Sequence, residues 1–334
     1  MDVLCLVTMG LLSVAAGVDV QKADLLMPGA QPAQPDQYLC TSLQLDKAEE
    51  HYIVGFDPHG NMSTAHHILL YGCASPGSEE PIWNCGEMAD KKNSDQYEMG
   101  PVCSEGPSII YAWALNAKKL ELPKGVGFKV GGKTPIRHLV LQVHYMHAMK
   151  QPDSSSGITL HHTDEPMPRR AGTLLMVTGG KMDGGSEDHF ETACVIDEPV
   201  VLHPFAFRTH THKHGYAVSG WLVQRDQNDV DHWTLIGKKS PQLPQMFYPV
   251  NNDKIEINEG DVVASRCTMR NAGSEEVAIG SHGSDEMCNF YMMYWVDGDE
   301  ILSDNTCYSP GPPTFYWEKE GLNHIPEREA SSPE

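Results

Sequence analysis

The chain has 334 residues, which suggests two or three domains at roughly 100–200 residues each. It carries 24 Lys and Arg against 45 Asp and Glu, and its formal net charge of -21 argues against binding to nucleic acid or to an anionic membrane, since both need a basic face. The counts of 17 His and 16 Met are high and indicate a metal protein, and a thioether beside imidazoles favours copper over zinc.

An apolar run covers residues 3–16 at the N-terminus. It is too short to span a bilayer, and Ala15 and Gly17 supply the small residues of a cleavage site, so we interpret residues 1–17 as a secretory signal peptide. The start carries Asp2 and no Lys or Arg, which leaves a buried first strand as the alternative. No later stretch approaches ~20 apolar residues, so no membrane anchor is expected.

Eight of the nine Cys remain after the predicted cleavage removes Cys5. An even number behind a signal peptide predicts disulfides, although about 105 pairings are possible and spacing alone selects none. Free buried thiols are the alternative. The eight form two sets of four, which are Cys40, Cys73, Cys85 and Cys103, and then Cys194, Cys267, Cys288 and Cys307. Asn61 begins an Asn-Met-Ser sequon and is a predicted N-glycosylation site.

Short runs rich in Val, Ile, Leu, Tyr and Thr, broken by Gly, Pro, Asn and Asp, predict β-strands along the chain, with no strong helical pattern. Short strands separated by turn signals are typical of β-sandwiches. A polar, proline-containing link at 163–170 divides the chain into similar halves, and residues 309–334, rich in Pro and Glu, indicate an extended tail. The clearest runs are 52–56, 138–147, 173–178, 216–223, 262–267 and 290–296.

Three histidines of the first half are candidate metal ligands. His66 and His67 precede an apolar run, and His144 lies between Val143 and Tyr145. Adjacent residues of a regular strand point to opposite faces, so one metal could use both His66 and His67 only on a distorted strand or through different ring nitrogens. Hydrogen-bonded histidines without a metal are the alternative. Seven others fit no ligand spacing, namely His138, His147, His161, His162, His189, His203 and His214.

The run Arg208-Thr209-His210-Thr211-His212 is the strongest signal of the second half. Residues two apart in a strand share a face, so Arg208, His210 and His212 would line one side and both imidazoles could reach one metal. A solvated or hydrogen-bonded histidine pair is the alternative.

A second alternating run follows at Met287, Asn289 and Tyr291, with Cys288 facing the other way. If the two strands lie close together, two imidazoles and a thioether meet around one metal. Arg208 would then form a polar pocket with Asn289 and Tyr291, and arginine is the usual fork for a carboxylate. A core position is the alternative for Met287.

The chain lacks the residue patterns of several other metal and catalytic sites. The chain has no His-Glu-x-x-His for a zinc protease, no Gly-x-Ser-x-Gly elbow and no Gly-x-Gly-x-x-Gly loop. A blue-copper site needs Cys, His and Met close together, but the next His after Cys288 is His324.

With these residues the sequence resembles the peptidylglycine α-hydroxylating monooxygenases, which belong to the copper type II, ascorbate-dependent monooxygenases. The resemblance runs from about Met27 to Cys307. It rests on motifs at 64–73, 111–114, 122–128, 141–145, 208–212, 241–245 and 285–289.

The resemblance implies an all-β fold with two antiparallel, jelly-roll-like β-sandwich domains in tandem, at 27–168 and 169–308, each contributing one copper. It implies that His66, His67 and His144 hold an electron-transfer copper. His210, His212 and Met287 would hold the catalytic copper that binds dioxygen, and the substrate-binding residues would be Arg208 for the peptide carboxylate with Asn289 and Tyr291 beside it. The implied disulfides are Cys40–Cys85, Cys73–Cys103, Cys194–Cys307 and Cys267–Cys288.

The implied reaction uses O2 and ascorbate to hydroxylate Cα of the C-terminal glycine of glycine-extended peptides, the first step of peptide amidation. It would take place in the secretory granule lumen or outside the cell. Because the chain stops soon after Cys307, a separate lyase is expected to act on the product. A dopamine β-monooxygenase-like hydroxylase and a non-catalytic secreted copper-binding module are the alternatives.

Overall fold

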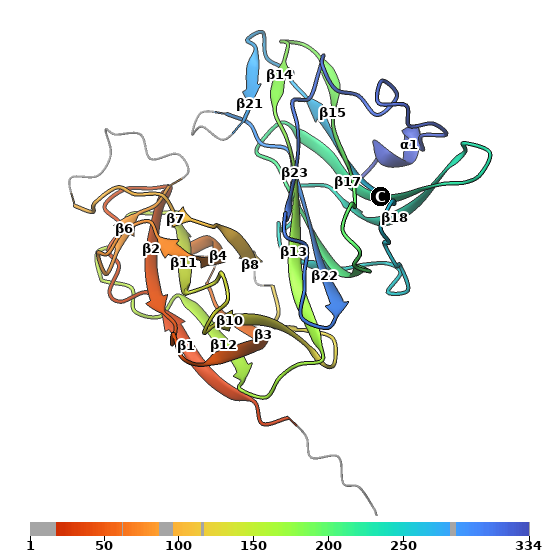
Figure 1. Ribbon diagram of the computed structural model, residues 1–334. Coiled ribbons are helices and arrows are strands. Elements are labelled where there is room, and N and C mark those ends of the chain that lie inside the picture. Colours follow the sequence, from red (N-terminus) through yellow and green to blue (C-terminus); the bar gives the residue numbers. More distant parts are fainter. Residues whose placement is uncertain (1–17, 62, 87–95, 115–116, 281–284, 334) are drawn as a thin grey trace, which may run out of the picture.

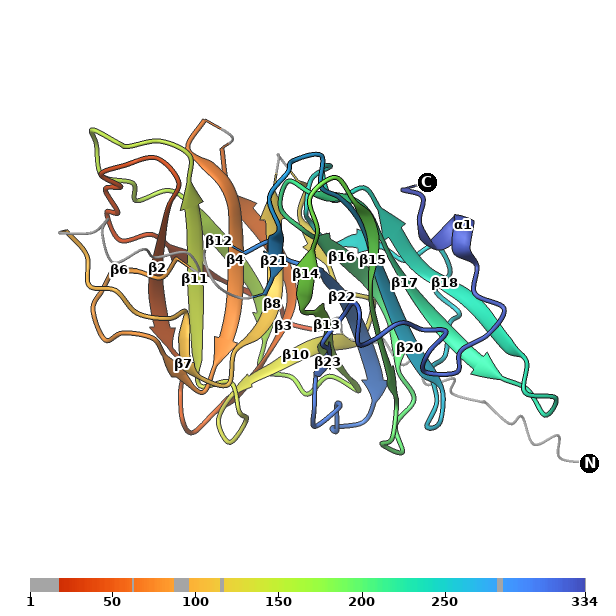
Figure 2. The same ribbon diagram turned by 90° about the horizontal axis from the view of Figure 1, so that it is seen from above.

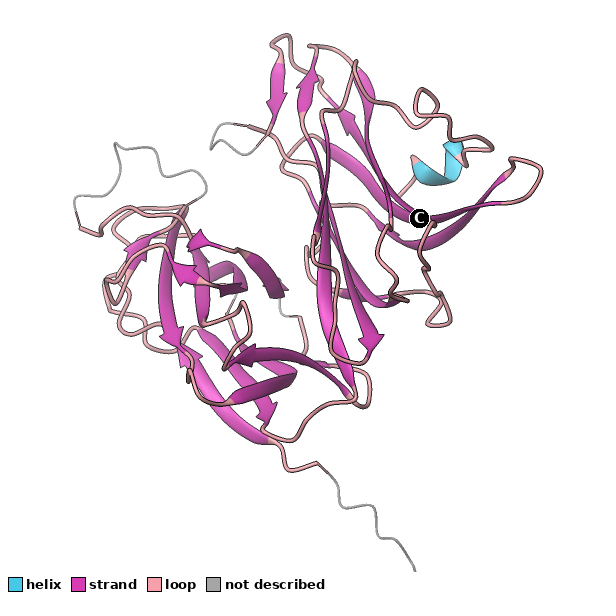
Figure 3. Ribbon diagram, viewed as in Figure 1, coloured by secondary structure: helices cyan, strands magenta, loops and turns pink. Residues whose placement is uncertain are grey.

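The computed structural model describes residues 18–61, 63–86, 96–114, 117–280 and 285–333 (Figure 1). The predicted signal peptide at 1–17 lies outside the described residues. In these ranges, regular structure is almost entirely strand, with one short helix, α1 (Glu327–Ala330), near the C-terminus (Figure 3). Among the described residues, no helix is long and apolar enough to cross a membrane. The predicted all-β class is therefore confirmed.

Strands of the first half build two facing sheets. One has the order β6-β2-β11-β4-β8, and the other is the β1-β12-β3-β10 part of a larger sheet. Apolar residues of both sheets share one core, in which Phe56 stacks on Tyr111 with ring centroids 4.6 Å apart. The strands are β1 (Gln21–Leu26), β2 (Gln37–Gln44), β3 (Glu50–His59), β4 (Ala65–Cys73), β5 (Ser75–Pro76), β6 (Trp83–Asn84), β7 (Cys103–Glu105), β8 (Ser108–Ala114), β9 (Leu120–Glu121), β10 (Val126–Gly131), β11 (His138–Tyr145) and β12 (Gly157–Thr163).

The second half repeats this plan beside the first (Figure 2). The β13-β22-β16-β19 part of the large sheet faces a sheet of order β15-β20-β17-β18 across a core that contains Phe190, Phe207 and Phe290. The strands are β13 (Arg169–Thr178), β14 (Gly180–Met182), β15 (Glu187–Val195), β16 (His203–His210), β17 (Gly215–Arg225), β18 (Asp231–Lys239), β19 (Tyr248–Pro249), β20 (Val262–Arg270), β21 (Val277–Ile279), β22 (Asn289–Asp297) and β23 (Thr306–Ser309).

The six clearest predicted strands lie in β3, β11, β13, β17, β20 and β22, and β11 ends at Tyr145 rather than at residue 147. One pairing was not predicted. Strands β10 and β13 pair in parallel, with Val126 opposite Arg169 and Gly127 opposite Arg170, so one sheet continues from the first half into the second. Residues 164–168 connect β12 to β13 beside this junction.

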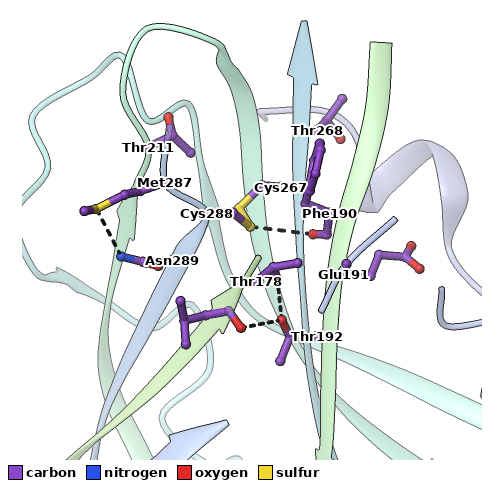
Figure 4. Close-up of a disulfide and its surroundings, with 12 residues drawn as sticks. Thr178, Phe190, Glu191, Thr192, Thr211, Cys267, Thr268, Met287, Cys288 and Asn289 are labelled. Atoms are coloured by element: carbon purple, nitrogen blue, oxygen red, sulfur yellow. Dashed lines mark hydrogen bonds between the residues drawn. A yellow bond between two sulfur atoms is a disulfide. The ribbon is translucent and has the colours of Figure 1, made fainter. Parts of the chain in front are cut away.

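Four disulfides cross-link the chain, two in each half, and their pairs are those that the resemblance implied. Cys267–Cys288 ties β20 to the residue just before β22, and Met287 extends away from that bridge (Figure 4). Because the neighbouring Cys288 is fixed in the core, the backbone that carries Met287 is fixed as well. The bridges are Cys40–Cys85, Cys73–Cys103, Cys194–Cys307 and Cys267–Cys288.

The segment after Ser309 differs from the expected extended tail. Its described residues, 310–333, contain no strand, but they pack on the outer sheet of the second half. Trp317 is fully buried, and its indole N–H donates to the carbonyl of Thr192 at 3.0 Å. The guanidinium of Arg266 lies over the Trp317 ring and pairs with Glu191. A few apolar residues among the Pro and Glu thus hold this segment to the domain.

Candidate metal centres

A bulge in β4 brings the first histidine cluster together. His144 of β11 pairs with His67, but the next residue, Tyr145, pairs with Ala65, so His66 is the extra residue of a β-bulge. The distortion turns both adjacent histidines toward His144. The ring centroids lie 5.5 Å apart for His66 and His67 and 4.9 Å apart for His67 and His144. One nitrogen from each ring lies within 4.8 Å of the other two, as one metal requires.

The electrostatics of this cluster suit a metal ion. Burial lowers the pKa of His144 to about 4, and loss of hydration together with repulsion from His144 lowers the pKa of His67 well below its usual value. The rings of His67 and His144 therefore resist protonation near neutral pH, and a metal binds only the neutral imidazole. Neither ring nitrogen of His144 makes a hydrogen bond of standard geometry, although Nε2 lies 3.3 Å from the exposed carboxylate of Asp36. Tyr38 stacks on the ring with centroids 4.0 Å apart. A buried ring nitrogen of His144 is therefore available to a metal.

Strands β16 and β22 build the second cluster. Their register sets Arg208 opposite Tyr291 and His210 opposite Asn289, so the next pair of the alternation is His212 and Met287, just beyond both strands. The rings of His210 and His212 lie edge to face with centroids 5.4 Å apart. The register therefore places the predicted ligand and pocket residues of both strands on one face.

Hydrogen bonds orient both rings of the second cluster. The Nδ1–H of His210 donates to the side-chain oxygen of Gln245, and the Nδ1–H of His212 donates to the carbonyl of Asp285 at 3.0 Å. This leaves Nε2 of each ring as the metal-binding nitrogen. The Met287 sulfur lies 3.9 Å from the amide nitrogen of Asn289 (Figure 4), and Met287 is 8% exposed. Two imidazoles and a soft thioether fit copper, including Cu(I).

Glu286 holds the backbone of this cluster. Glu286 is 2% exposed, and its carboxylate accepts the backbone N–H groups of His212, His214 and Met287, the last two at 2.9 and 2.8 Å. One buried anion thus connects the segment that bears His212 to the segment that bears Met287.

Replacing Glu286 with Ala should lower the free energy of unfolding by about 3 kcal/mol or more, because three backbone donors lose an ionised acceptor. Urea denaturation of the metal-free protein measures this. Glu276→Ala is a suitable control, since Glu276 forms an exposed ion pair with Lys181 and such pairs contribute about 0–1 kcal/mol. Equal losses in both variants would contradict the role of Glu286.

The two clusters line one cavity of about 380 Å³ between the halves. The positive charge of Arg208, in the second cluster, contributes to the low pKa of His67 in the first cluster. A larger cavity of about 1320 Å³ extends from Met287, Asn289 and Tyr291 between Phe128 of the first half and Leu175 of the second.

Arg208 is a buried cation without a counter-charge. It is 2% exposed, its Nε–H donates to the carbonyl of Gln245 at 2.8 Å, and its guanidinium lies 4.9 Å from the Tyr291 ring centroid. No carboxylate within the described ranges pairs with it. The Oδ1 atom of Asn289, nearby, is buried without a hydrogen-bond partner. Both groups can receive a polar, anionic ligand from the cavity.

Family models match both halves of the chain. The N-terminal domain of the copper type II ascorbate-dependent monooxygenases matches residues 23–152, and the C-terminal domain of the same enzymes matches residues 169–320. The chain belongs to this family. Copper and ascorbate are the cofactor and reductant that the family name gives, and the two histidine-rich clusters supply ligands of the right type.

Similar proteins include amidating monooxygenases and, at lower identity, a hydroxylase. Peptidyl-glycine alpha-amidating monooxygenase A of Xenopus laevis is 40% identical over 309 residues, which cover 91% of this chain and 31% of the relative. The Mus musculus enzyme is 39% identical over 88% of this chain and 28% of its own length. Dopamine beta-hydroxylase of Canis lupus familiaris is more distant, at 27% identity over 83% of this chain and 45% of its own. The chain thus spans about a third of the amidating relatives.

Three residues of the centres have no role that the sequence analysis predicts, namely Tyr38, Gln245 and Glu286. Gln245 and Glu286 do lie in motifs that carry the resemblance, and a polar residue beside a ligand motif is a signal for an orienting partner. Tyr38 gives no such signal, because it meets His144 only through the pairing of β2 with β11. Asn61 is exposed, and its glycosylation stays a prediction.

Proposed function

We propose that this chain hydroxylates Cα of the C-terminal glycine of peptides, with the C-terminal carboxylate bound to Arg208. The observation that carries the proposal is the buried, unpaired guanidinium of Arg208 beside His210 and Met287. A buried charge without a partner is costly, so the pocket is built for an anion. The names of the amidating relatives agree with a peptide substrate.

Each pocket residue has a defined task. The guanidinium of Arg208 donates two hydrogen bonds to the carboxylate, and the unpartnered Oδ1 of Asn289 accepts the N–H of the terminal glycine. Tyr291, whose ring lies against Arg208, closes the side of the pocket. The Cα of the terminal glycine then lies beside Met287, with no side chain to obstruct it. The rest of the peptide lies in the larger cavity. Copper would supply the oxidation chemistry with O2 at this site, with ascorbate as the electron source.

We further propose two copper sites, one at His66, His67 and His144 and one at His210, His212 and Met287. His67→Ala should reduce the copper content from two ions per chain to one, because it removes a ligand from the first set only. Elemental analysis after dialysis measures this, and His138→Ala controls for the loss of a histidine on the same sheet. A single copper in the unaltered protein would contradict the two-site proposal.

The decisive assay combines O2 consumption with mass spectrometry of the product. With ascorbate and a glycine-extended peptide, the peptide should gain one oxygen atom while the second is reduced to water by two electrons from ascorbate. A phenylethylamine tested in parallel addresses the dopamine β-hydroxylase-like alternative. Turnover of the amine alone would overturn the peptide assignment, and no turnover of either would favour a copper-binding module without catalysis.

Both matched regions are monooxygenase domains, so the activity that we propose for this chain is the hydroxylation step. A separate lyase would then convert the α-hydroxyglycine product to the amide. Four disulfides fit an oxidising compartment, and we propose the secretory pathway, including the granule lumen, as the location of this chain.

A further inference from the structure

A third histidine cluster lies on the other sheet of the first half. It consists of His51 on β3, His162 on β12 and Asp164 in the link to β13. The first copper cluster, in contrast, is built on β4 and β11. One ligand atom from each of the three side chains lies within 4.8 Å of the other two.

A change of register puts these three residues on one face. His161 pairs with Gly55, but His162 pairs with Ile53, so Val54 is an extra residue on β3. The pairing of Thr163 with Tyr52 then sets Asp164 across from His51. Without the bulge, Asp164 would stand across from Tyr52, and His51 would face the opposite side of the sheet.

The side chains already converge. The Nδ1 of His51 lies 2.7 Å from the Asp164 carboxylate, and the rings of His51 and His162 stand edge to face at 5.8 Å. Burial and the neighbouring His51 lower the pKa of His162, which keeps its lone pair available near neutral pH. The side chain of His51 is 21% exposed and that of Asp164 is 55% exposed, so water can reach the cluster.

We propose that His51, His162 and Asp164 form a third metal site, which takes a divalent transition metal of the Zn²⁺ class. Two imidazoles and one carboxylate, with a position left for water, are a common donor set for zinc, and the lack of a thioether or thiolate disfavours Cu(I). A tetrahedral zinc site with bonds of about 2.0–2.1 Å spaces its ligands roughly 3.3 Å apart, so small side-chain rotations complete it. The metal would cross-link β3 and β12 to the segment that connects the two halves.

The test uses the full chain loaded with copper and probes it with Zn²⁺. Dialysis followed by elemental analysis should find one zinc per chain in addition to the copper. His162→Leu should weaken zinc binding by at least about a hundredfold, since the loss of even an outer partner of a ligand costs 10- to 100-fold. Copper content and hydroxylase activity should not change. The zinc X-ray absorption spectrum should contain nitrogen and oxygen neighbours and no sulfur.

His161→Leu is the matched control, because His161 is the neighbouring residue on β12 but is no member of the cluster, and this variant should retain the zinc. Asp164→Asn is a second variant, on an exposed side chain, and it too should weaken binding. Zinc that binds equally well to the native chain and to His162→Leu would overturn the proposal, as would the absence of any zinc beyond the copper.

Discussion

Replacing Met287 with Ile should nearly abolish hydroxylation while copper stays bound at His66, His67 and His144. Only the second cluster contains a thioether, and the loss of a metal ligand should cost more than the 10- to 100-fold typical of outer partners, so we expect a loss above about 100-fold. Isoleucine has a similar volume, so the fold should change little. Ascorbate-dependent O2 consumption and elemental analysis on the same samples measure both effects.

Met292→Ile is the matched control. Met292 lies on β22, a few residues after Met287, and is 1% exposed, but it belongs to the core of the second half rather than to the cavity. This variant should lose less than about 1.5 kcal/mol of stability and retain normal turnover. Near-normal turnover in Met287→Ile would instead mean that Met287 is a core residue, which is the commoner fate of a buried methionine.

The second centre could be predicted from sequence because it follows the period of two of a strand. Alternation alone grouped Arg208 with His210 and Met287 with Asn289, and the observed register of β16 and β22 brings these two faces together. The register itself could not be predicted, because the residues of one strand do not determine which strand it pairs with. The resemblance supplied that missing step.

The first and third clusters show where alternation fails. His66 and His67 meet His144 through one bulge, and His51 meets Asp164 through another. A bulge shifts every later side chain to the other face, and its position depends on the partner strand. His162 therefore matched no ligand spacing in the sequence. The same limit applies to the parallel pair of β10 and β13, since long-range pairing leaves no local signal.

Replacing Arg208 with Ala should weaken kcat/KM for a glycine-extended peptide by roughly tenfold to a hundredfold or more. A hydrogen bond to a charged group contributes about 1.5–3 kcal/mol, and 1.4 kcal/mol corresponds to a factor of about ten. Arg208→Lys retains the charge but loses the planar fork, so it should restore only part of the rate. Steady-state kinetics of the three proteins with one peptide measures this series.

The decisive comparison repeats the kinetics of the native chain and of Arg208→Ala with a peptide whose C-terminal glycine is amidated. The native chain should hydroxylate the amide poorly, because the peptide has lost the charge that Arg208 binds. Arg208→Ala should then make little further difference to the amide, although it greatly slows the reaction of the acid. This non-additivity assigns the lost energy to the one contact between guanidinium and carboxylate. If Arg208→Ala slows both peptides by the same factor, Arg208 supports the pocket through Gln245 and Tyr291 instead and does not bind the carboxylate.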